Sequence, residues 1–274
     1  MDEFIITVAP GAPYAATQAF PDLPHTPEQL AAEVVRACQA GAAIAHLHVL
    51  DEHGKATESL TAFKRTVALI REQCDIIIEG STGGAVPFSA AARSVALQAD
   101  IELASLNPGS VNFADVAYTN SPQDIDYWVK EMQRRHIKAA ITVFDSSWIA
   151  NSLPYVEQGL ISKPLFYNFV LGQTGAVPAT ARHALFLIES LPPGSLWELT
   201  GHSGNDMKTV LWALAFGGHA RVGYEDNIYV SPGMRSTSNA VLVERAVRLG
   251  REAGREPASP AQVRSLLGLA ARQQ

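Results

Sequence analysis

Two histidines separated by a single residue are the first feature of the chain that could do chemistry. His46 and His48 lie in the short aliphatic run 44–49, which is typical of a buried strand. Because side chains alternate along a strand, both imidazoles point to one face, about 7 Å apart, and can bind a single metal ion. A lone histidine in such a strand is usually a hydrogen-bonded core residue. Two are harder to bury without a shared role, since every ring nitrogen needs a partner.

A carboxylate for a third ligand position is available at Glu225-Asp226. These residues follow the predicted strand 219–222, and Gly223 permits the turn that two adjacent side chains need if both are to reach one site. Two histidines and one carboxylate with an open position form a catalytic zinc set.

Arg221 lies inside the same predicted strand, where a guanidinium needs an anionic partner. That partner is either an anion of the site or, in a purely structural salt bridge, a core acid such as Glu79 or Glu198. The sequence leaves both interpretations open.

The loop Gly80-Ser81-Thr82-Gly83-Gly84 offers backbone N–H groups to a carboxylate or an oxyanion. Glycine is common in any tight turn from a strand to a helix, so this loop alone does not identify a site. Further polar residues at predicted strand ends are Ser105, Asn107, Asp145 and Asn168. We interpret His53 and His202 as loop residues rather than ligands.

Strand and helix patterns alternate along the whole chain and would position these groups. The predicted strands are 4–9, 44–49, 76–79, 101–106, 139–144, 165–171, 196–200 and 219–222, and the segment 10–27 reads as a loop. The predicted helices are 27–40, 57–73, 89–98, 121–136, 148–159, 179–191, 206–216 and 237–253, with a last one after Pro260. This alternation predicts an α/β protein, a (β/α)8 TIM barrel with extra C-terminal helices that could pack on a neighbouring subunit. An open doubly wound sheet is the alternative.

Composition sets the broad class. The chain has 274 residues, 47% of them hydrophobic and 18% charged, and no linker interrupts it, so we expect one domain over residues 1–274. A net charge of −6 without basic clusters argues against nucleic acid as a partner. The chain lacks a secretion signal and a membrane-spanning segment, and Cys38 and Cys74 show no CxxC spacing. We therefore expect a cytoplasmic protein with reduced cysteines.

Taken together, the motifs resemble the β-keto acid cleavage enzymes. The matching segments are His46-Leu47-His48, Ser81-Thr82-Gly83-Gly84, Leu106-Asn107-Pro108-Gly109, Arg221 through Asn227, Ser238-Asn239 through Leu242-Val243, and Leu23-Pro24-His25-Thr26-Pro27-Glu28. They span nearly the whole chain in order and at the expected spacing.

The resemblance implies a zinc-containing (β/α)8 barrel that forms homo-oligomers, commonly tetramers. It implies a reaction in which a 3-oxo acid and acetyl-CoA, the co-substrate, give acetoacetate and a new acyl-CoA. The implied zinc ligands are His46, His48 and Glu225. The implied catalytic residues are Asp226 as general base with Ser81 and Arg221 to orient and polarise, and the implied substrate-binding residues are Thr82, Gly84, Ser105 and Asn107.

Three positions depart from the family pattern. Leu50 stands where an arginine is usual, and Pro13 and Thr142 stand where the enzymes for an amino-bearing 3-oxo acid have acidic residues. Without those carboxylates a substrate ammonium lacks its natural partners, so we expect a neutral, apolar or hydroxylated substrate side chain. Two other functions remain open. One is a zinc hydrolase on a barrel, which would not need acetyl-CoA, and the other is a metal-binding homologue without turnover.

Overall fold

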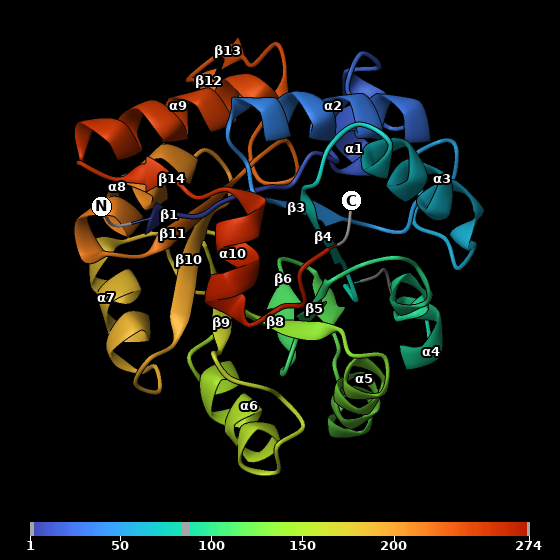
Figure 1. Cartoon of the computed structure of the whole chain (residues 1–274), viewed down its shortest axis with the longest axis vertical. Coiled ribbons are helices and arrows are strands. Elements are labelled where there is room, and N and C mark those ends of the chain that lie inside the picture. The colour runs from blue at the N-terminus through green and yellow to red at the C-terminus, as the bar shows by residue number, and fades with distance from the viewer. Residues whose placement is uncertain (1–2, 84–87, 273–274) are drawn as a thin grey trace.

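A computed structural model describes residues 3–83 and 88–272, and in this part of the chain eight parallel strands close into a barrel (Figure 1). In order round the barrel the strands are β2 (Ile6–Val8), β3 (Ile44–Leu47), β4 (Ile77–Gly80), β5 (Leu103–Leu106), β8 (Lys138–Val143), β9 (Phe166–Leu171), β10 (Leu196–Gly201) and β11 (His219–Val222). Pairing of β11 with β2 closes the ring. The predicted (β/α)8 barrel is confirmed, and the open sheet is wrong.

Helices follow the strands and form the outer layer of the barrel. They are α1 (Tyr14–Ala19), α2 (Pro27–Ala40), α3 (Leu60–Arg71), α4 (Ala90–Arg93), α5 (Pro122–Arg134), α6 (Ser147–Glu157), α7 (Ala181–Glu189), α8 (Asp206–Phe216), α9 (Asn239–Glu252) and α10 (Pro260–Leu267). Helix α2 begins where the sequence predicted, because Thr26 and Gln29 form a reciprocal capping box and Pro27 occupies the first turn. Within the described residues, no helix combines the length and apolar character needed to span a bilayer.

Several short elements were not predicted. Helix α1 lies in the segment that we expected to be a loop. The sequence did not indicate this helix, because its six residues have no side-chain cap and no clear hydrophobic periodicity. The predicted helix 89–98 divides into α4 and a 3₁₀ helix (Val95–Gln98). The remaining additions are short strand pairs: β1 (Glu3–Phe4) with β14 (Glu256–Pro257), β6 (Val111–Phe113) with β7 (Val116–Tyr118), and β12 (Tyr229–Ser231) with β13 (Met234–Arg235).

The two C-terminal helices have different roles. Helix α9 follows the eighth barrel strand and packs beside α2, so it completes the outer ring. Helix α10 is the additional one. Its Val263 and Leu267 join Ile5, Ile44 and Phe166 in an apolar cluster at the amino-terminal end of the barrel. Helix α10 therefore closes the end of the barrel opposite to the carboxyl ends of the strands.

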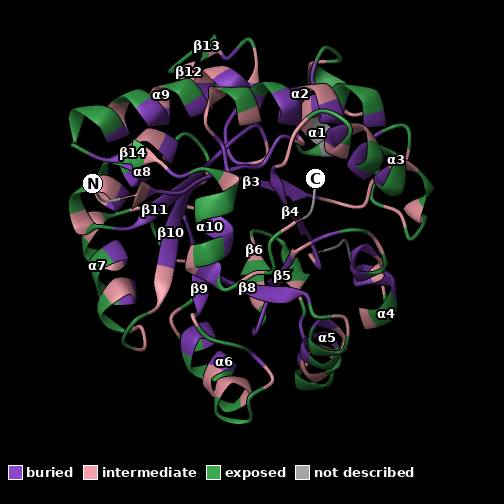
Figure 2. Ribbon diagram, viewed as in Figure 1, coloured by how far each residue is buried: buried purple, intermediate pink, exposed green. Residues whose placement is uncertain are grey.

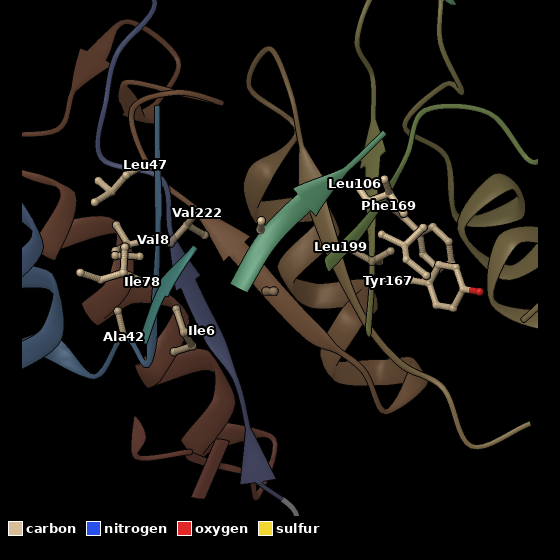
Figure 3. Packing of buried hydrophobic residues seen from close by; sticks show 14 of the residues in the cluster. Ile6, Val8, Ala42, Leu47, Ile78, Leu106, Tyr167, Phe169, Leu199 and Val222 are labelled. Carbon is tan, nitrogen blue, oxygen red and sulfur yellow. The ribbon is translucent and has the colours of Figure 1, made fainter. Parts of the chain in front are cut away.

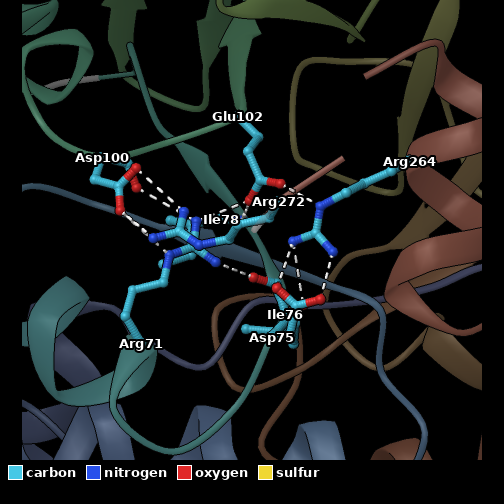
Figure 4. A network of polar contacts seen from close by, with 8 residues as sticks. All are labelled: Arg71, Asp75, Ile76, Ile78, Asp100, Glu102, Arg264 and Arg272. Atoms are coloured by element: carbon cyan, nitrogen blue, oxygen red, sulfur yellow. Dashed lines mark hydrogen bonds and ion pairs between the residues drawn. The ribbon is translucent and has the colours of Figure 1, made fainter. Parts of the chain in front are cut away.

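An ion-pair network fixes α10 in that position (Figure 4). Arg264 lies in α10 and donates hydrogen bonds to both carboxylate oxygens of Asp75 and to Glu102. Arg71 donates to the other oxygen of Glu102 at 2.8 Å. Because Glu102 is shared by two arginines, the network joins α3, α10 and the segment before β5 into one unit.

The main apolar core lies between the barrel strands and the surrounding helices (Figures 2 and 3). Its members include Ile6, Val8, Ile78, Leu106 and Leu199, all from barrel strands and all fully buried. Cys38 and Cys74 pack against this core and are free, as predicted.

The barrel interior contains buried polar residues. Glu198 is fully buried and accepts a hydrogen bond from the Thr7 hydroxyl at 2.6 Å, while its second oxygen has no partner. Burial, reinforced by the negative charge of Glu79, raises the pKa of Glu198 to about 8. The folded protein therefore keeps this side chain protonated at pH values where the unfolded chain ionises it.

We predict that Glu198→Gln removes one pH-dependent contribution to stability. A raised carboxyl pKa means that the folded state holds a proton which the unfolded chain releases above its ordinary value of 4.5. The free energy of unfolding of the wild type should thus fall, relative to the variant, as the pH rises from 4.5 to about 8. Urea unfolding of the metal-free proteins at about pH 5 and about pH 9 measures this difference. The exposed Glu58→Gln is the matched control, and equal pH dependence in wild type and Glu198→Gln would contradict the assignment.

Candidate active site

His46, His48 and Glu225 converge at the carboxyl ends of β3 and β11. The Nε2 atom of His46 lies 3.8 Å from Glu225 Oε2, and the Nε2 atom of His48 lies 3.3 Å from Glu225 Oε1. One potential ligand atom from each residue falls within 4.8 Å of the other two. The two imidazole rings meet edge to face, with centroids 5.1 Å apart. The predicted convergence of two histidines and a carboxylate is therefore present.

Glu79 orients one of these histidines. It lies beside His46 in the parallel register of β3 and β4, and the two side chains form a 2.8 Å hydrogen bond between His46 Nδ1 and Glu79 Oε1. Because a carboxylate accepts, Nδ1 donates and Nε2 remains available as a ligand. A carboxylate behind a histidine ligand is the usual second contact of metal-binding imidazoles.

The turn after β11 brings Glu225 and Asp226 into the same site. Gly223 adopts a φ of 140°, and a Cβ atom there would lie 2.3 Å from the Ala9 carbonyl oxygen. The turn is held by bonds from the Asp226 and Asn227 N–H groups to the Gly223 carbonyl. Glycine is needed here because a side chain fits neither the backbone conformation nor the space, as the sequence indicated.

Arg221 binds both carboxylates of that turn. It donates from Nη2 to Glu225 Oε1 at 2.6 Å, from Nε to Asp226 Oδ2 at 2.9 Å and from Nη2 to Asp226 Oδ1 at 3.2 Å. The alternative partners considered for Arg221 were Glu79 and Glu198. Among the described contacts, its hydrogen bonds go to Glu225 and Asp226 instead. The buried guanidinium instead fixes the orientation of two neighbouring acids.

The two adjacent acids have different protonation behaviour. Burial alone would raise the pKa of Glu225, but Arg221, His48 and His46 together hold it well below its usual value. For Asp226, burial and the negative charge of Glu225 outweigh Arg221 and raise the pKa. Glu225 is therefore the better ligand for a cation, and Asp226 the better proton acceptor.

These residues fit a metal ion. Glu225 Oε2 is buried without a hydrogen-bond partner, which is costly unless something positive binds there. Two imidazole nitrogens face the same carboxylate, and this donor set is one that divalent transition metals favour. Within the described residues, no further histidine joins the group.

A cavity of about 310 Å³ lies in front of this group. It is lined by the predicted residues Ser81, Ser105, Asn107, Arg221 and Asp226 as well as by both histidines and Glu225. In the loop that contains Ser81, the Ser81 Oγ atom accepts a hydrogen bond from the Gly83 N–H group at 3.1 Å. The lining of the cavity thus combines hydroxyl and amide groups with the two acids.

Some predicted residues lie elsewhere. Thr82 is fully buried behind the cavity wall, where its hydroxyl donates to the Ser105 carbonyl at 2.5 Å and its N–H to Ser105 Oγ at 3.0 Å. Gly84 lies outside the described residues. Asp145 is exposed and bonds Ser147 in the first turn of α6, and Asn168 accepts from Thr200 inside the barrel.

Other cavity residues were not singled out from the sequence. Arg93 is buried at the cavity wall and donates to Thr82, Tyr118, Thr119 and Asn120, so it joins α4 to the β6–β7 hairpin. Phe113 and Phe144 supply an aromatic wall, with ring centroids 4.8 Å apart. An arginine after a run of alanines is a weak signal, and the hairpin itself was not predicted.

The three departures from the family pattern surround the site. Thr142 lines the central cavity. Pro13 and Leu50 line a second cavity of about 300 Å³ on the other side of the histidines, which also contains Leu30 and Phe63. The second cavity is therefore largely apolar where the family pattern would place charge.

Comparisons with known proteins show which family the chain belongs to. A family model for the beta-keto acid cleavage enzymes matches residues 3–269. The 3-keto-5-aminohexanoate cleavage enzyme of Fusobacterium nucleatum is 39% identical over 271 residues, which cover 98% of this chain and 99% of that protein. The 3-oxoadipate:acetyl-CoA acetyltransferase of Cupriavidus necator is 33% identical and covers 97% of this chain and 94% of its own length.

A solved structure supports the fold. The apo structure of ObcA superposes with a TM-score of 0.79 at 21% identity, covering 92% of this chain and 66% of that one. At this identity the likeness shows the barrel fold alone.

We predict that Glu79→Gln weakens metal binding without unfolding the protein. The amide keeps a hydrogen-bond acceptor for His46 but loses the negative charge that makes the imidazole a stronger donor. We expect the dissociation constant for Zn²⁺ and Co²⁺, measured by competition with a chelator, to rise about tenfold or more. Glu198→Gln, a buried carboxyl of the same barrel without a ligand histidine, is the control. Equal metal affinities for Glu79→Gln and the wild type would refute this role.

Proposed function

The chain belongs to the β-keto acid cleavage enzymes, and we propose that it converts a 3-oxo acid with a neutral side chain and acetyl-CoA into acetoacetate and a new acyl-CoA, with Zn²⁺ at His46, His48 and Glu225. The observation that carries this proposal is that Arg221 holds two adjacent carboxylates of the turn after β11, of which Glu225 faces the two histidines. A candidate metal site and a candidate base thereby lie in adjacent residues facing one cavity.

The proposed metal fits the difficulty of the reaction. The C2 proton of a 3-oxo acid is too weakly acidic for an aspartate alone. When bound, Zn²⁺ would supply a Lewis acid that stabilises negative charge developing on the 3-keto oxygen. The chain's own contribution is to keep the ligand set oriented through Glu79 and Arg221.

Asp226 is the proposed base. One of its oxygens would accept the C2 proton, and the raised pKa makes the buried carboxylate a better acceptor than an exposed aspartate. Arg221 holds Asp226 through two hydrogen bonds and limits its rotation, so the carboxylate stays aimed at one position.

The carbon skeleton would then be exchanged in two steps. The substrate C2, deprotonated by Asp226, attacks the acetyl carbonyl, a carbon–carbon bond forms, and CoA leaves as its thiolate. The thiolate next attacks the original C3 carbonyl, the C2–C3 bond breaks, and the proton held by Asp226 returns to C2. The products are acetoacetate and the acyl-CoA of the remaining chain. Ser81, Ser105 and Asn107 line the same cavity and are the proposed groups for the substrate carboxylate.

We also propose a homo-oligomer, a tetramer as the family resemblance implies. The exposed apolar residues Leu185, Phe186 and Leu211 on α7 and α8 support an association surface on the outer ring.

We predict that Asp226→Asn keeps Zn²⁺ and loses most activity. The amide preserves the shape and an acceptor for Arg221 but cannot take a proton, so kcat should fall by about 10²- to 10⁴-fold. Bound zinc per chain and acetoacetate formation from a panel of 3-oxo acids are the two measurements. Asp145→Asn, at a strand end outside the cavity, is the control. A fully active Asp226→Asn enzyme would eliminate this residue as the base, and product formation without acetyl-CoA would favour a hydrolase.

We predict a preference for neutral substrates over the amino substrate named for the Fusobacterium relative. The carboxylates of the central cavity are Glu225 and Asp226, which the proposal already uses, and Thr142 leaves no other acid for an ammonium among the described residues that line this cavity. The kcat/KM for 3-oxohexanoate should exceed that for 3-keto-5-aminohexanoate by about tenfold or more.

Pro13 offers a matched test of this preference, because it is exposed and lines the second cavity. Pro13→Glu should move the ratio of kcat/KM toward the amino substrate, whereas Pro13→Gln, which changes the shape without adding charge, should not. Equal or better turnover of the amino substrate by the wild type would refute the prediction.

A further inference from the structure

A long open groove leaves the site on the side of β10 and β11. It has a volume of about 750 Å³ and runs between the loop 201–205, the start of α8 and the segment 224–233. Its inner end shares His202, Glu225 and Asp226 with the central cavity. A molecule lying in the groove would therefore place one end beside the proposed base and the other at the surface.

The groove lining contains two cations, Lys208 and Arg245, in addition to the carboxylates of Asp206, Glu225 and Asp226. Lys208 is exposed there and contacts Asn205 Oδ1 at 3.3 Å, and the half-buried Arg245 donates to the Val230 carbonyl. The other two cavities lack an exposed lysine or arginine among their described lining residues. Arg93 and Arg221 of the central cavity are buried, and the second cavity is lined by Asp51 but by no lysine or arginine. Lys208 is therefore the exposed cation among the described residues that line these three cavities.

The groove wall also contains a buried acceptor without a partner. Asp206 is 3% exposed, and its Oδ1 accepts from the Asn227 amide at 2.8 Å. Its Oδ2 has no hydrogen-bond partner although it is buried. Such an atom is costly to leave unsatisfied, and an N–H or O–H group of a ligand in the groove would satisfy it.

The geometry points to this groove as the binding site of the CoA part of acetyl-CoA, an inference that rests on the proposed function. The acetyl thioester would reach Asp226 at the inner end, the amide and hydroxyl groups of the pantetheine arm would lie along the wall at Asp206, and the phosphates would meet Lys208 and Arg245 at the rim.

The location agrees with the general anatomy of such barrels. Strands β10 and β11 are the seventh and eighth strands in sequence order, and the loops after these strands often form phosphate sites in (β/α)8 enzymes. The separation between thioester and phosphates in CoA also requires an elongated open site. The central cavity, at about 310 Å³, is left for the 3-oxo acid.

Two variants test different parts of the groove. Lys208→Glu reverses the exposed rim charge, and Ser231→Trp places a large ring in the groove beyond the reach of the reacting atoms. Lys64→Glu, an exposed lysine on α3 outside the described cavities, is the matched charge control. The probes are CoA in titration calorimetry, and acetyl-CoA or acetyl-pantetheine in steady-state assays with saturating 3-oxo acid.

For Lys208→Glu we expect KM for acetyl-CoA and the dissociation constant for CoA to rise about tenfold, with KM for acetyl-pantetheine unchanged, because the truncated thioester lacks the phosphates. Ser231→Trp should raise KM for both thioesters and leave KM for the 3-oxo acid unaltered. The control should match the wild type.

The outcomes separate this inference from the proposed function. A wild type that makes acetoacetate from acetyl-CoA, combined with unchanged CoA affinity in both groove variants, overturns the groove assignment and leaves the function intact. A wild type that binds CoA, with affinity lost in the groove variants, yet forms no acetoacetate with any 3-oxo acid, supports the groove and refutes the reaction.

Discussion

The contact between Arg221 and the two acids after β11 is the interaction on which the site depends. A guanidinium buried in a barrel strand must be compensated, and here both compensating groups come from the turn that follows. The turn is possible because Gly223 approaches the Ala9 backbone at the end of the neighbouring strand β2. Barrel closure therefore defines where Glu225 lies, and Glu225 in turn completes the group formed with His46 and His48.

Parallel register determines how the other half of the site is built. His46 and Glu79 are neighbours in β3 and β4, so the carboxylate behind the histidine comes from the adjacent strand. The far end of the barrel is closed by α10 and by the shared carboxylate of Glu102, which leaves the carboxyl ends of the strands as the open face. The contacts that stabilise the barrel through α10 and the candidate active site thus lie at opposite ends of the barrel, as is usual for this architecture.

Much of this organisation could be predicted from the sequence, for identifiable reasons. The eight strands are short aliphatic runs with clear boundaries, and the histidine pair and Gly223-Tyr224-Glu225-Asp226 carry local signals. Arg93, Phe113 and the role of Glu79 were missed because each depends on a partner far along the chain. Thr82 shows the converse limit: its strand-end position suggests a substrate contact, yet its side chain is buried against Ser105. Local pattern indicates the strand end but not the direction of each side chain there.

Two adjacent carboxylates with different roles raise a physical problem, because they follow one another in the chain and share one arginine. The difference arises from the histidines, which face Glu225 and lower its pKa, whereas Asp226 lies beside the negative charge of Glu225 itself. The two acids are therefore coupled, since ionised Glu225 makes Asp226 more basic and Arg221 keeps the pair from separating. A single carboxylate in this position could not be at once a permanent anion for a cation and a proton acceptor, so the Glu-Asp pair is the smallest arrangement that meets both requirements.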